Sequence, residues 1–132
     1  MTARKLVILV TGGRNYDDLD HMVERLGRYA GRDVTLVHGD CGGADRLAVK
    51  AVRRLGCRWL LHPMAADWHK HGRKAGPLRN QRMVEACVRA RERGAEVIVE
   101  AFPGDRGTAD CVRRAFGAAL PVRTPTCDAV PL

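Results

Sequence analysis

Long apolar runs, paired cysteines and aromatic side chains are scarce in this sequence of 132 residues. Its apolar stretches are much shorter than the roughly 20 residues that a membrane-spanning helix needs. The N-terminal segment, MTARKLVILVTGG, ends its hydrophobic part in glycines and lacks the small-residue cleavage site of a signal peptide. We therefore expect a cytoplasmic protein with no membrane partner.

The five cysteines are odd in number, and none belongs to a C-x-x-C pair. This pattern favours neither a disulfide framework nor a closed zinc site, and it fits a reducing compartment. Asp67, His69 and His71 alternate in a way that resembles a set of metal ligands. The neighbouring Lys70 and Lys74 disfavour a divalent cation there. We therefore expect neither a metal nor a cofactor.

Positive charge is in excess, with 23 Lys and Arg against 15 Asp and Glu and a formal net charge of +8. Such an excess attracts nucleotides or nucleic acid. An arginine-, alanine- and glycine-rich composition also arises from GC-rich coding without a selected basic patch. Only two Trp, two Tyr and two Phe are present, so a groove for single-stranded nucleic acid would have few stacking platforms. A nucleic-acid partner therefore remains the less favoured alternative, based on the basic segment 70–93.

Apolar runs alternate with helical patterns along the chain. Strands are expected at residues 5–10, 34–37, 59–61, 95–102 and, at one edge, 122–124. Helices are expected at 17–30, 44–55, 77–93 and 108–120, with a long loop at 64–76. This order predicts an α/β fold, a Rossmann-like doubly wound parallel sheet of four to five strands flanked by helices. We expect one domain, residues 1–125, followed by a C-terminal tail, residues 126–132.

Glycine-rich turns follow the first, second and fourth expected strands. Because the strand-to-helix loops of a parallel sheet lie at one edge, we expect these turns to converge there. Glycines let the backbone approach a ligand, and the free N–H groups of a helix start attract anions. The sequence therefore predicts a phosphate site at this edge, although each turn alone also fits an ordinary loop. The candidate residues of these turns are Gly12, Gly13, Gly39, Gly42, Gly43, Pro103, Gly104, Gly107 and Thr108.

Four side chains of the first two turns are further candidates. Arg14 either binds the ligand or is a solvated surface charge, and GGRNYDD lacks the third glycine of the dinucleotide fingerprint. Tyr16 either stacks on a base or closes its loop over the sheet edge. Asp40 is expected at the ligand edge, where its carboxylate accepts hydrogen bonds from ribose hydroxyls. Asp45 is a ligand candidate too, but an acid at a helix start also stabilises the helix by itself.

Two arginines lie in the first turns of the helix expected from Pro77. Arg79 and Arg82 oppose the helix macrodipole there, and a violated local preference is typical of functional sites. Their guanidinium groups suit a phosphate or a carboxylate. Ion pairs with Asp67 or Asp105 are the alternative.

Two other residues stand out from their surroundings. Trp68 lies in the expected long loop, where it either covers a pocket or packs under the loop. Glu100 lies in an otherwise apolar strand, where it is either catalytic or exposed near the end of the strand.

Four motifs, GGRNYDD, HGDCGGAD, AGPLRNQRM and FPGDRGTAD, together resemble the YspA-like branch of the SLOG superfamily. The resemblance covers about residues 6–116. The superfamily groups Rossmann-like domains from the DNA-processing protein DprA, the LOG phosphoribohydrolases and sensors of nucleotide-derived signals. The resemblance implies a Rossmann-like fold that binds a nucleotide or a nucleotide-derived small molecule.

The last motif is similar to the P-G-G-x-G-T-x-x-E loop of LOG enzymes, with Pro103, Gly104, Gly107 and Thr108 at matching positions. In those enzymes the loop holds the phosphate of a nucleoside monophosphate. The resemblance therefore implies phosphate binding by this loop. Asp105 replaces the second glycine of the loop, and its negative charge opposes a phosphate.

The arginine of the LOG motif R-K-x-x-M is matched by Arg79, with Met83 at the methionine position. In LOG enzymes this arginine and the glutamate of the loop assist cleavage of the N-glycosidic bond. Here Cys111 stands at the glutamate position, and the adjacent Asp110 is rotated by about 100° around the helix. The resemblance implies phosphoribohydrolase activity, with Arg79 and a carboxylate, Asp110 or Asp40, as the catalytic residues.

DprA-like members carry an R-N-R run similar to Arg79, Asn80 and Arg82 with one residue inserted, and they bind single-stranded DNA. Three hypotheses follow. The chain is a nucleotide-binding domain with phosphoribohydrolase activity, a non-catalytic sensor of a nucleotide- or NAD-derived signal, or a single-strand nucleic-acid binder. The missing glutamate favours the sensor, and the sequence leaves a homo-oligomer open.

Overall fold

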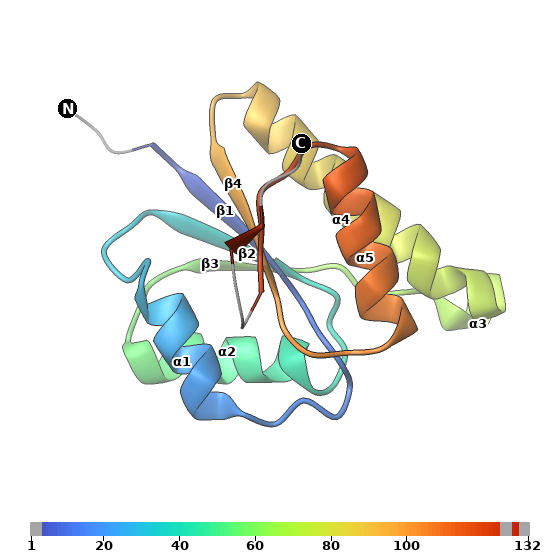
Figure 1. The fold of residues 1–132 in the computed structure, drawn as a ribbon, viewed down its shortest axis with the longest axis horizontal. Helices are drawn as coiled ribbons and strands as arrows, with labels where there is room; N and C mark the ends of the chain where they lie inside the picture. The colour runs from blue at the N-terminus through green and yellow to red at the C-terminus, as the bar shows by residue number, and fades with distance from the viewer. Residues whose placement is uncertain (1–3, 125–127, 130–132) are drawn as a thin grey trace.

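A single sheet runs through the computed structural model, which describes residues 4–124 and 128–129 (Figure 1). The strand order is β3-β2-β1-β4-β5-β6. The bounds are β1 Leu6–Thr11, β2 Val34–His38, β3 Leu60–Pro63, β4 Glu96–Ala101, β5 Val122–Arg123 and β6 Asp128–Ala129. Strands β1 to β5 pair in parallel, and β6 pairs antiparallel with β5.

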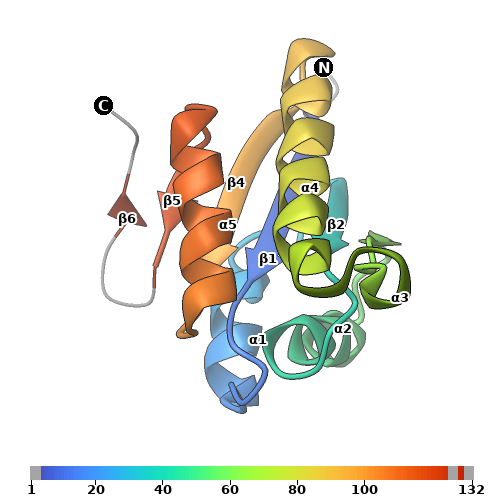
Figure 2. The same ribbon diagram turned by 90° about the vertical axis from the view of Figure 1, so that its right-hand side faces the viewer.

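Helices cover both faces of this sheet (Figures 1 and 2). The bounds are α1 Leu19–Gly27, α2 Ala44–Leu55, α3 Trp68–His71, η1 Gly72–Lys74, α4 Ala75–Glu92 and α5 Arg106–Gly117. Helices α1 and α2 pack on one face, and α4 and α5 pack on the other. The predicted Rossmann-like doubly wound parallel sheet is therefore confirmed.

The β1 strand forms the centre of both hydrophobic layers because its side chains are apolar on both faces. Leu6, Ile8 and Val10 pack into the layer of α1 and α2. Val7 and Leu9 pack into the layer of α4 and α5. An unbroken aliphatic run is typical of a parallel strand that is buried on both sides.

The chain reverses its direction of travel across the sheet at β1. It moves outward from β1 to β2 and β3, and then returns so that β4 pairs with the other edge of β1. In open α/β sheets ligands bind at such a switch point, beyond the carboxyl ends of the strands. Here that place is the end of β1, at Thr11.

The segment 64–76 differs from its expected structure. Instead of a long loop it contains α3, η1 and the first residues of α4. The side chain of Asp67 caps α3 by accepting a hydrogen bond from the Lys70 N–H at 3.0 Å. A single helical turn with no buried residues has no apolar periodicity, so the sequence pattern did not indicate it.

Smaller differences occur at the element ends. Helix α4 begins at Ala75, two residues before Pro77, and α5 begins at Arg106 rather than Thr108. The antiparallel β6 adds a sixth strand that was not expected. The rest of the predicted tail, residues 126–132, lies outside the described residues. None of the helices in the described part of the chain is long and apolar enough to cross a membrane.

A buried ionic cluster joins β4 to α1. Glu100 is only 1% exposed and accepts two hydrogen bonds from the Arg25 guanidinium, at 2.9 and 3.2 Å. The hydroxyl of Tyr29 donates a third bond to it at 2.7 Å. Glu100 is therefore not exposed, and it does not line the cleft described below. Its position in an apolar strand is explained by this internal ion pair.

Candidate ligand-binding cleft

Three strand-to-helix turns meet at the carboxyl edge of the sheet, as the sequence predicts. The N–H of Gly13, in the turn after β1, donates to the carbonyl oxygen of Pro103 after β4 at 2.9 Å. The carbonyl oxygen of Gly13 accepts from the N–H of Ala44 after β2 at 3.1 Å. The backbone of Gly13 therefore joins the turns after β2 and β4 to the turn after β1.

Several predicted ligand-binding glycines are required by this contact between loops. Gly43 has a φ of 68°, and a Cβ there would collide with the carbonyl oxygen of Gly13. A Cβ on Gly104 would lie 2.7 Å from the nitrogen of Gly13. Gly42, in contrast, has open space around its missing side chain. The glycines bring the turns together, and the walls of the cleft come mainly from side chains.

A cleft of about 640 Å³ opens beside the joined turns, at the end of β1. Val10 and Thr11 of β1 form part of its lining, together with the first half of α4 and the first turns of α5. Trp68 of α3 and Cys41 of the β2–α2 turn also line it. The cleft therefore lies at the switch point of the sheet.

The structure brings about half of the predicted site residues to this cleft. Those that line it are Gly12, Arg14, Asp45, Arg79, Gly107, Thr108 and Asp110. Those outside its lining are Gly13, Gly39, Asp40, Gly42, Gly43, Arg82, Pro103 and Gly104.

Two of the residues outside the lining were predicted to act through their side chains. Asp40 is exposed and has a φ of 55°, and its backbone N–H donates to Nδ1 of His38 at 3.1 Å. Arg82 is also exposed, and its guanidinium donates to the carbonyl oxygen of Ala65 at 3.1 Å. Neither side chain contributes to the cleft.

Arg79 reaches the cleft and is held there by neutral groups. Its Nη1 donates to the carbonyl oxygen of Gly39 at 2.7 Å and contacts Sγ of Cys41 at 3.6 Å. Its Nε donates to Oδ1 of Asn80 at 2.9 Å. Within residues 4–124, no carboxylate lies at ion-pair distance from Arg79, so the predicted alternative of a pair with Asp67 or Asp105 is wrong.

Asn80 connects the two helices that form the walls. Its side chain is buried, with 3% of the residue exposed. Its Nδ2 donates to the carbonyl oxygen of Gly107 at 3.1 Å and to Oδ2 of Asp110 at 3.0 Å. It therefore fixes Arg79, on α4, relative to the start of α5. The sequence indicated Asn80 only as a member of a DprA-like motif, because its role depends on contacts about 30 positions away.

Asp110 lies in the cleft in its ionised form. Burial opposes ionisation, but hydrogen bonds from Arg114 and Asn80 and the charges of Arg114 and Arg113 outweigh it and lower the pKa of the carboxyl. Cys111, at the position of the LOG glutamate, is fully buried in the layer under α5, and burial raises the pKa of its thiol to about 11. The carboxylate that α5 brings to the cleft is therefore Asp110, one position earlier.

Asp45 is the second carboxyl group of interest in the cleft, at the start of α2. Burial raises its pKa to about 6, although the N–H groups of Cys41 and Gly39 donate to it and the charge of Arg79 acts in the opposite direction. The bond from the Cys41 N–H is 3.2 Å long. Asp45 therefore orders the β2–α2 turn and titrates close to neutral pH.

The start of α5 carries its own capping carboxylate. Oδ1 of Asp105 accepts a hydrogen bond from the Gly107 N–H at 3.3 Å. Both residues are exposed, and the bond is long. A phosphate at this helix start would have to displace the Asp105 carboxylate from the Gly107 N–H. This carboxylate is a weak competitor because it is solvated.

The aromatic residues near the cleft have different roles. The hydroxyl of Tyr16 lies 3.1 Å from Nδ1 of His21, and its ring packs 5.3 Å from that of Phe102, measured between centroids. Tyr16 therefore closes its loop over the sheet edge. Trp68 lines the cleft, and the guanidinium of Arg14 lies over its ring at 5.6 Å from the centroid. Trp68 therefore forms part of the wall of the pocket, which is closer to the first of its two predicted alternatives, covering a pocket, than to packing under the loop.

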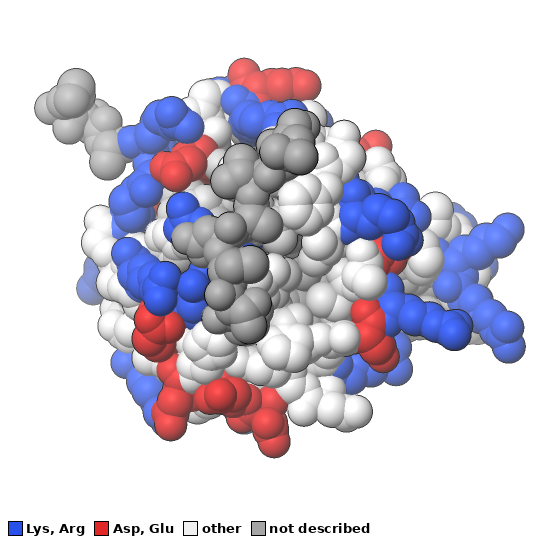
Figure 3. Space-filling model, viewed as in Figure 1, with Lys and Arg blue, Asp and Glu red and all other residues white. Residues whose placement is uncertain are grey.

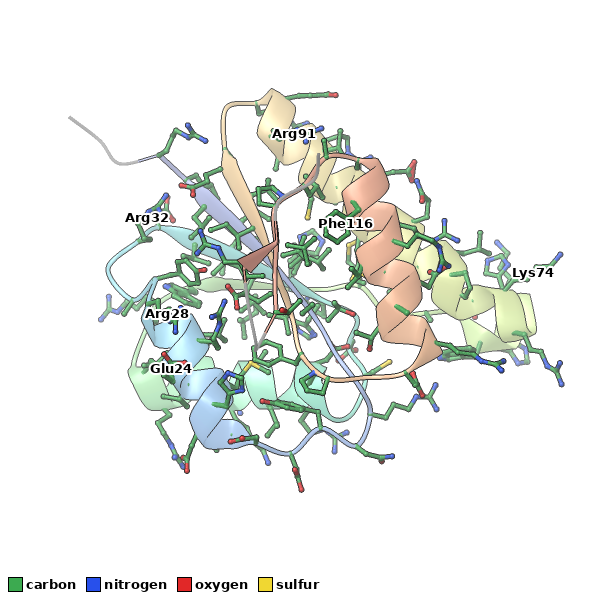
Figure 4. The ribbon with its side chains drawn as sticks, viewed as in Figure 1. Glu24, Arg28, Arg32, Lys74, Arg91 and Phe116 are labelled. Atoms are coloured by element: carbon green, nitrogen blue, oxygen red, sulfur yellow. The ribbon has the colours of Figure 1, made fainter. Side chains whose placement is uncertain are left out.

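Basic side chains gather at the end of the molecule formed by α3 and the start of α4 (Figure 3). Lys70, Arg73 and Lys74 are exposed there, and Lys74 points outward (Figure 4). Among the described residues the exposed aromatic side chains are Trp68 and Phe116, which lie on different helices. Single-strand binding by stacking needs successive aromatic platforms, so binding of nucleic acid here stays a prediction.

Comparisons with known proteins agree with this architecture. The YspA, cpYpsA-related SLOG family matches residues 6–71, which are half of the chain. The chain belongs to this family. The matched segment includes the first two glycine-rich turns and Trp68, whereas Arg79 and the start of α5 lie beyond it. Membership of the SLOG family supports a nucleotide-related binding domain.

Two proteins are similar over most of the chain. The gene 61 protein of Mycobacterium phage D29 is 37% identical over an alignment of 123 residues, and the match covers 87% of this chain and 92% of the phage protein. The X-ray structure of TM1055 superposes with a TM-score of 0.62 over 91% of this chain and 72% of that chain, at 19% identity. TM1055 therefore shares the fold of this SLOG domain.

The contact between the loops predicts a large loss of stability for one of two adjacent glycines and almost none for the other. Gly43→Ala places a Cβ against the carbonyl oxygen of Gly13 at a positive φ, so we expect it to lower the free energy of unfolding by about 2 kcal/mol. Gly42→Ala meets open space and should change it by less than about 0.5 kcal/mol. Urea denaturation of both variants measures this, and equal losses would contradict the packing role of Gly43.

The buried Asp45 predicts a pH-dependent stability. Its folded pKa of about 6 lies above the ordinary value of 3.8, so the ionised carboxylate destabilises the fold above pH 6 and this cost disappears as the pH falls towards 4. Asp45→Asn keeps an oxygen that accepts from Cys41. We expect it to raise the free energy of unfolding at pH 7.5 by up to about 3 kcal/mol, with a difference that shrinks towards pH 4. Urea denaturation between pH 4 and 8 tests this, and a difference independent of pH would refute it.

Proposed function

We propose that this chain binds a nucleotide or a nucleotide-derived small molecule in the cleft, through the phosphate of the ligand. Arg79 carries the proposal. Its guanidinium is fixed by the Gly39 carbonyl oxygen and Asn80, which are neutral, so its charge is available to an anion. A cation that is already ordered loses little conformational entropy when the ligand binds.

The other charges around the cleft support an anionic ligand. Arg14 and Arg106 line it with Arg79. The negative charge of Asp110 is balanced by ion pairs with Arg113 at 3.0 Å and Arg114 at 2.9 Å. The start of α5 adds the positive end of the helix dipole and backbone N–H groups, of which that of Gly107 becomes available when the phosphate displaces the solvated Asp105 carboxylate. These groups together favour a phosphate near Arg79 and Gly107.

The size of the cleft also fits such a ligand. Pockets that bind small molecules typically measure about 300–1,000 Å³, and this cleft measures about 640 Å³. It lies at the switch point of a Rossmann-like sheet, where dinucleotide- and mononucleotide-binding folds place their ligands.

Two arginines of α4 provide a matched test. Arg79→Ala should weaken binding of a nucleoside 5′-monophosphate at least about 10-fold, because it removes a charge-assisted contact in a partly enclosed site. Arg82→Ala should change affinity less than about 2-fold, because Arg82 lies outside the cleft. Isothermal titration calorimetry with AMP, GMP, CMP, UMP and ribose 5-phosphate measures both. Circular dichroism melts confirm that each variant is folded, and equal losses in the two variants would exclude Arg79 as the phosphate ligand.

A second candidate function is hydrolysis of the N-glycosidic bond of the bound nucleotide. The specific observation is that Asp45 and Asp110 line one cleft with pKa values moved in opposite directions. Such a pair supplies a carboxylic acid that donates a proton to the leaving base and a carboxylate that stabilises the oxocarbenium-like transition state, while water adds to C1′ of the ribose. Arg79 would hold the phosphate while the bond breaks. Asp40 is not part of this candidate site, because it lies outside the cleft.

Hydrolysis predicts release of free base. If this candidate is right, incubation with nucleoside monophosphates gives free base on chromatography, and Asp110→Asn lowers the rate at least about 100-fold while nucleotide binding is retained. Asp40→Asn is the control and should leave the rate unchanged. Nucleotide binding without any release of base would leave a non-catalytic sensor as the function.

A further inference from the structure

We propose that Trp68 is the stacking platform for the base of the nucleotide, and that it makes the cleft prefer nucleotides to simple sugar phosphates. This inference rests on the function proposed above. It assigns the base end of the ligand, whereas Arg79 and the start of α5 were assigned to the phosphate end.

Trp68 is unusual among the apolar side chains of the molecule. It is 46% exposed, whereas Trp59 is 8% exposed and belongs to the hydrophobic core. The other large apolar side chains that are exposed among the described residues, Leu60, Leu78 and Phe116, do not line the cleft. The cleft of a phosphate-binding site therefore presents one large, solvated aromatic surface.

The position of the indole is set by its neighbours. Trp68 is the first residue of α3, whose start is capped by Asp67. A Cβ on Gly76 would lie 3.2 Å from Cη2 of Trp68, so the glycine leaves room for the edge of the indole against α4. A buried glycine in the first turn of a helix is unfavourable by propensity. The close approach of Trp68 explains why glycine stands at this position. The contact with Gly76 gives the indole ring a defined place in the wall of the cleft.

The contact that covers Trp68 is one that a base can replace. The guanidinium of Arg14 lies 5.6 Å from the ring centroid, near the outer limit of about 6 Å for a cation–π contact. Arg14 is exposed, and exposed cation–π contacts are weaker than the stacking of a base on an aromatic side chain. Stacking of a base on Trp68 is therefore more favourable than the Arg14 contact that it displaces.

The chemistry of this wall defines the class of ligand. A phosphate site with an aromatic platform recognises a planar heterocycle joined to a phosphate through a sugar. An aromatic face offers no hydrogen-bonding pattern, so stacking alone accepts any base. The platform separates nucleotides from sugar phosphates and leaves the choice between bases to other groups.

The test compares ligands with and without a base on three proteins. We expect the wild type to bind at least one of AMP, GMP, CMP and UMP about 10-fold more tightly than ribose 5-phosphate, measured by isothermal titration calorimetry. Trp68→Ala should lose this preference, with the affinity for ribose 5-phosphate unchanged within about 2-fold. Trp68→Phe keeps an aromatic ring and should retain most of the preference.

Tryptophan fluorescence gives a second readout on the same samples. A stacked base should quench the emission of the exposed Trp68 in the wild type, and this change should be absent from Trp68→Phe, in which the buried Trp59 remains. Ribose 5-phosphate should leave the emission of Trp68 nearly unchanged.

Four results would overturn the inference. If nucleotides and ribose 5-phosphate bind the wild type equally, or if Trp68→Ala weakens both equally, Trp68 does not stack the base while the phosphate site stands. If Trp68→Ala, shown to be folded by circular dichroism, binds both classes as the wild type does, the base lies elsewhere. If none of these ligands binds the wild type, the proposed function fails, and the role of Trp68 fails with it.

Discussion

The shape of the cleft depends on two hydrogen bonds made by the backbone of one residue. Gly13 donates to Pro103 and accepts from Ala44, so three turns from distant parts of the chain form one continuous rim. Only residues without a side chain allow this approach, as the positions of Gly43 and Gly104 show. Val10 and Thr11 line the cleft beside this rim, and most of the other lining residues belong to α4 and α5.

The electrostatics of the cleft follow from how its charges are partnered. The negative charge of Asp110 is balanced by ion pairs with arginines of its own helix, while Arg79 is held by a carbonyl oxygen and an amide. Burial raises the pKa of Asp45 to about 6, so protonation reduces its repulsion of a bound anion as the pH falls towards 6. The solvated Asp105 is the carboxylate that competes with a phosphate at the start of α5. Positive charge therefore prevails where a ligand would enter.

Sequence patterns predicted the sheet, the meeting of the glycine-rich turns and the place of Arg79, because periodicity and parallel topology determine them. They did not predict α3, which is one turn long and buries no residue. They also missed the role of Asn80 and the burial of Glu100, since the partners Asp110 and Arg25 are 30 and 75 positions away. Contacts of that range depend on how the helices pack, which no local pattern records.

The strand at the outer end of the sheet has a further consequence. Leu60 of β3 is 63% exposed, and β3 has no neighbour on its other side within the described residues. An open strand is a template for pairing with another polypeptide, but this one has four residues and ends at Pro63, which has no N–H to donate. The short length and the terminal proline of β3 limit its pairing with a strand of another molecule. These two features therefore reduce edge-to-edge aggregation at this side of the sheet.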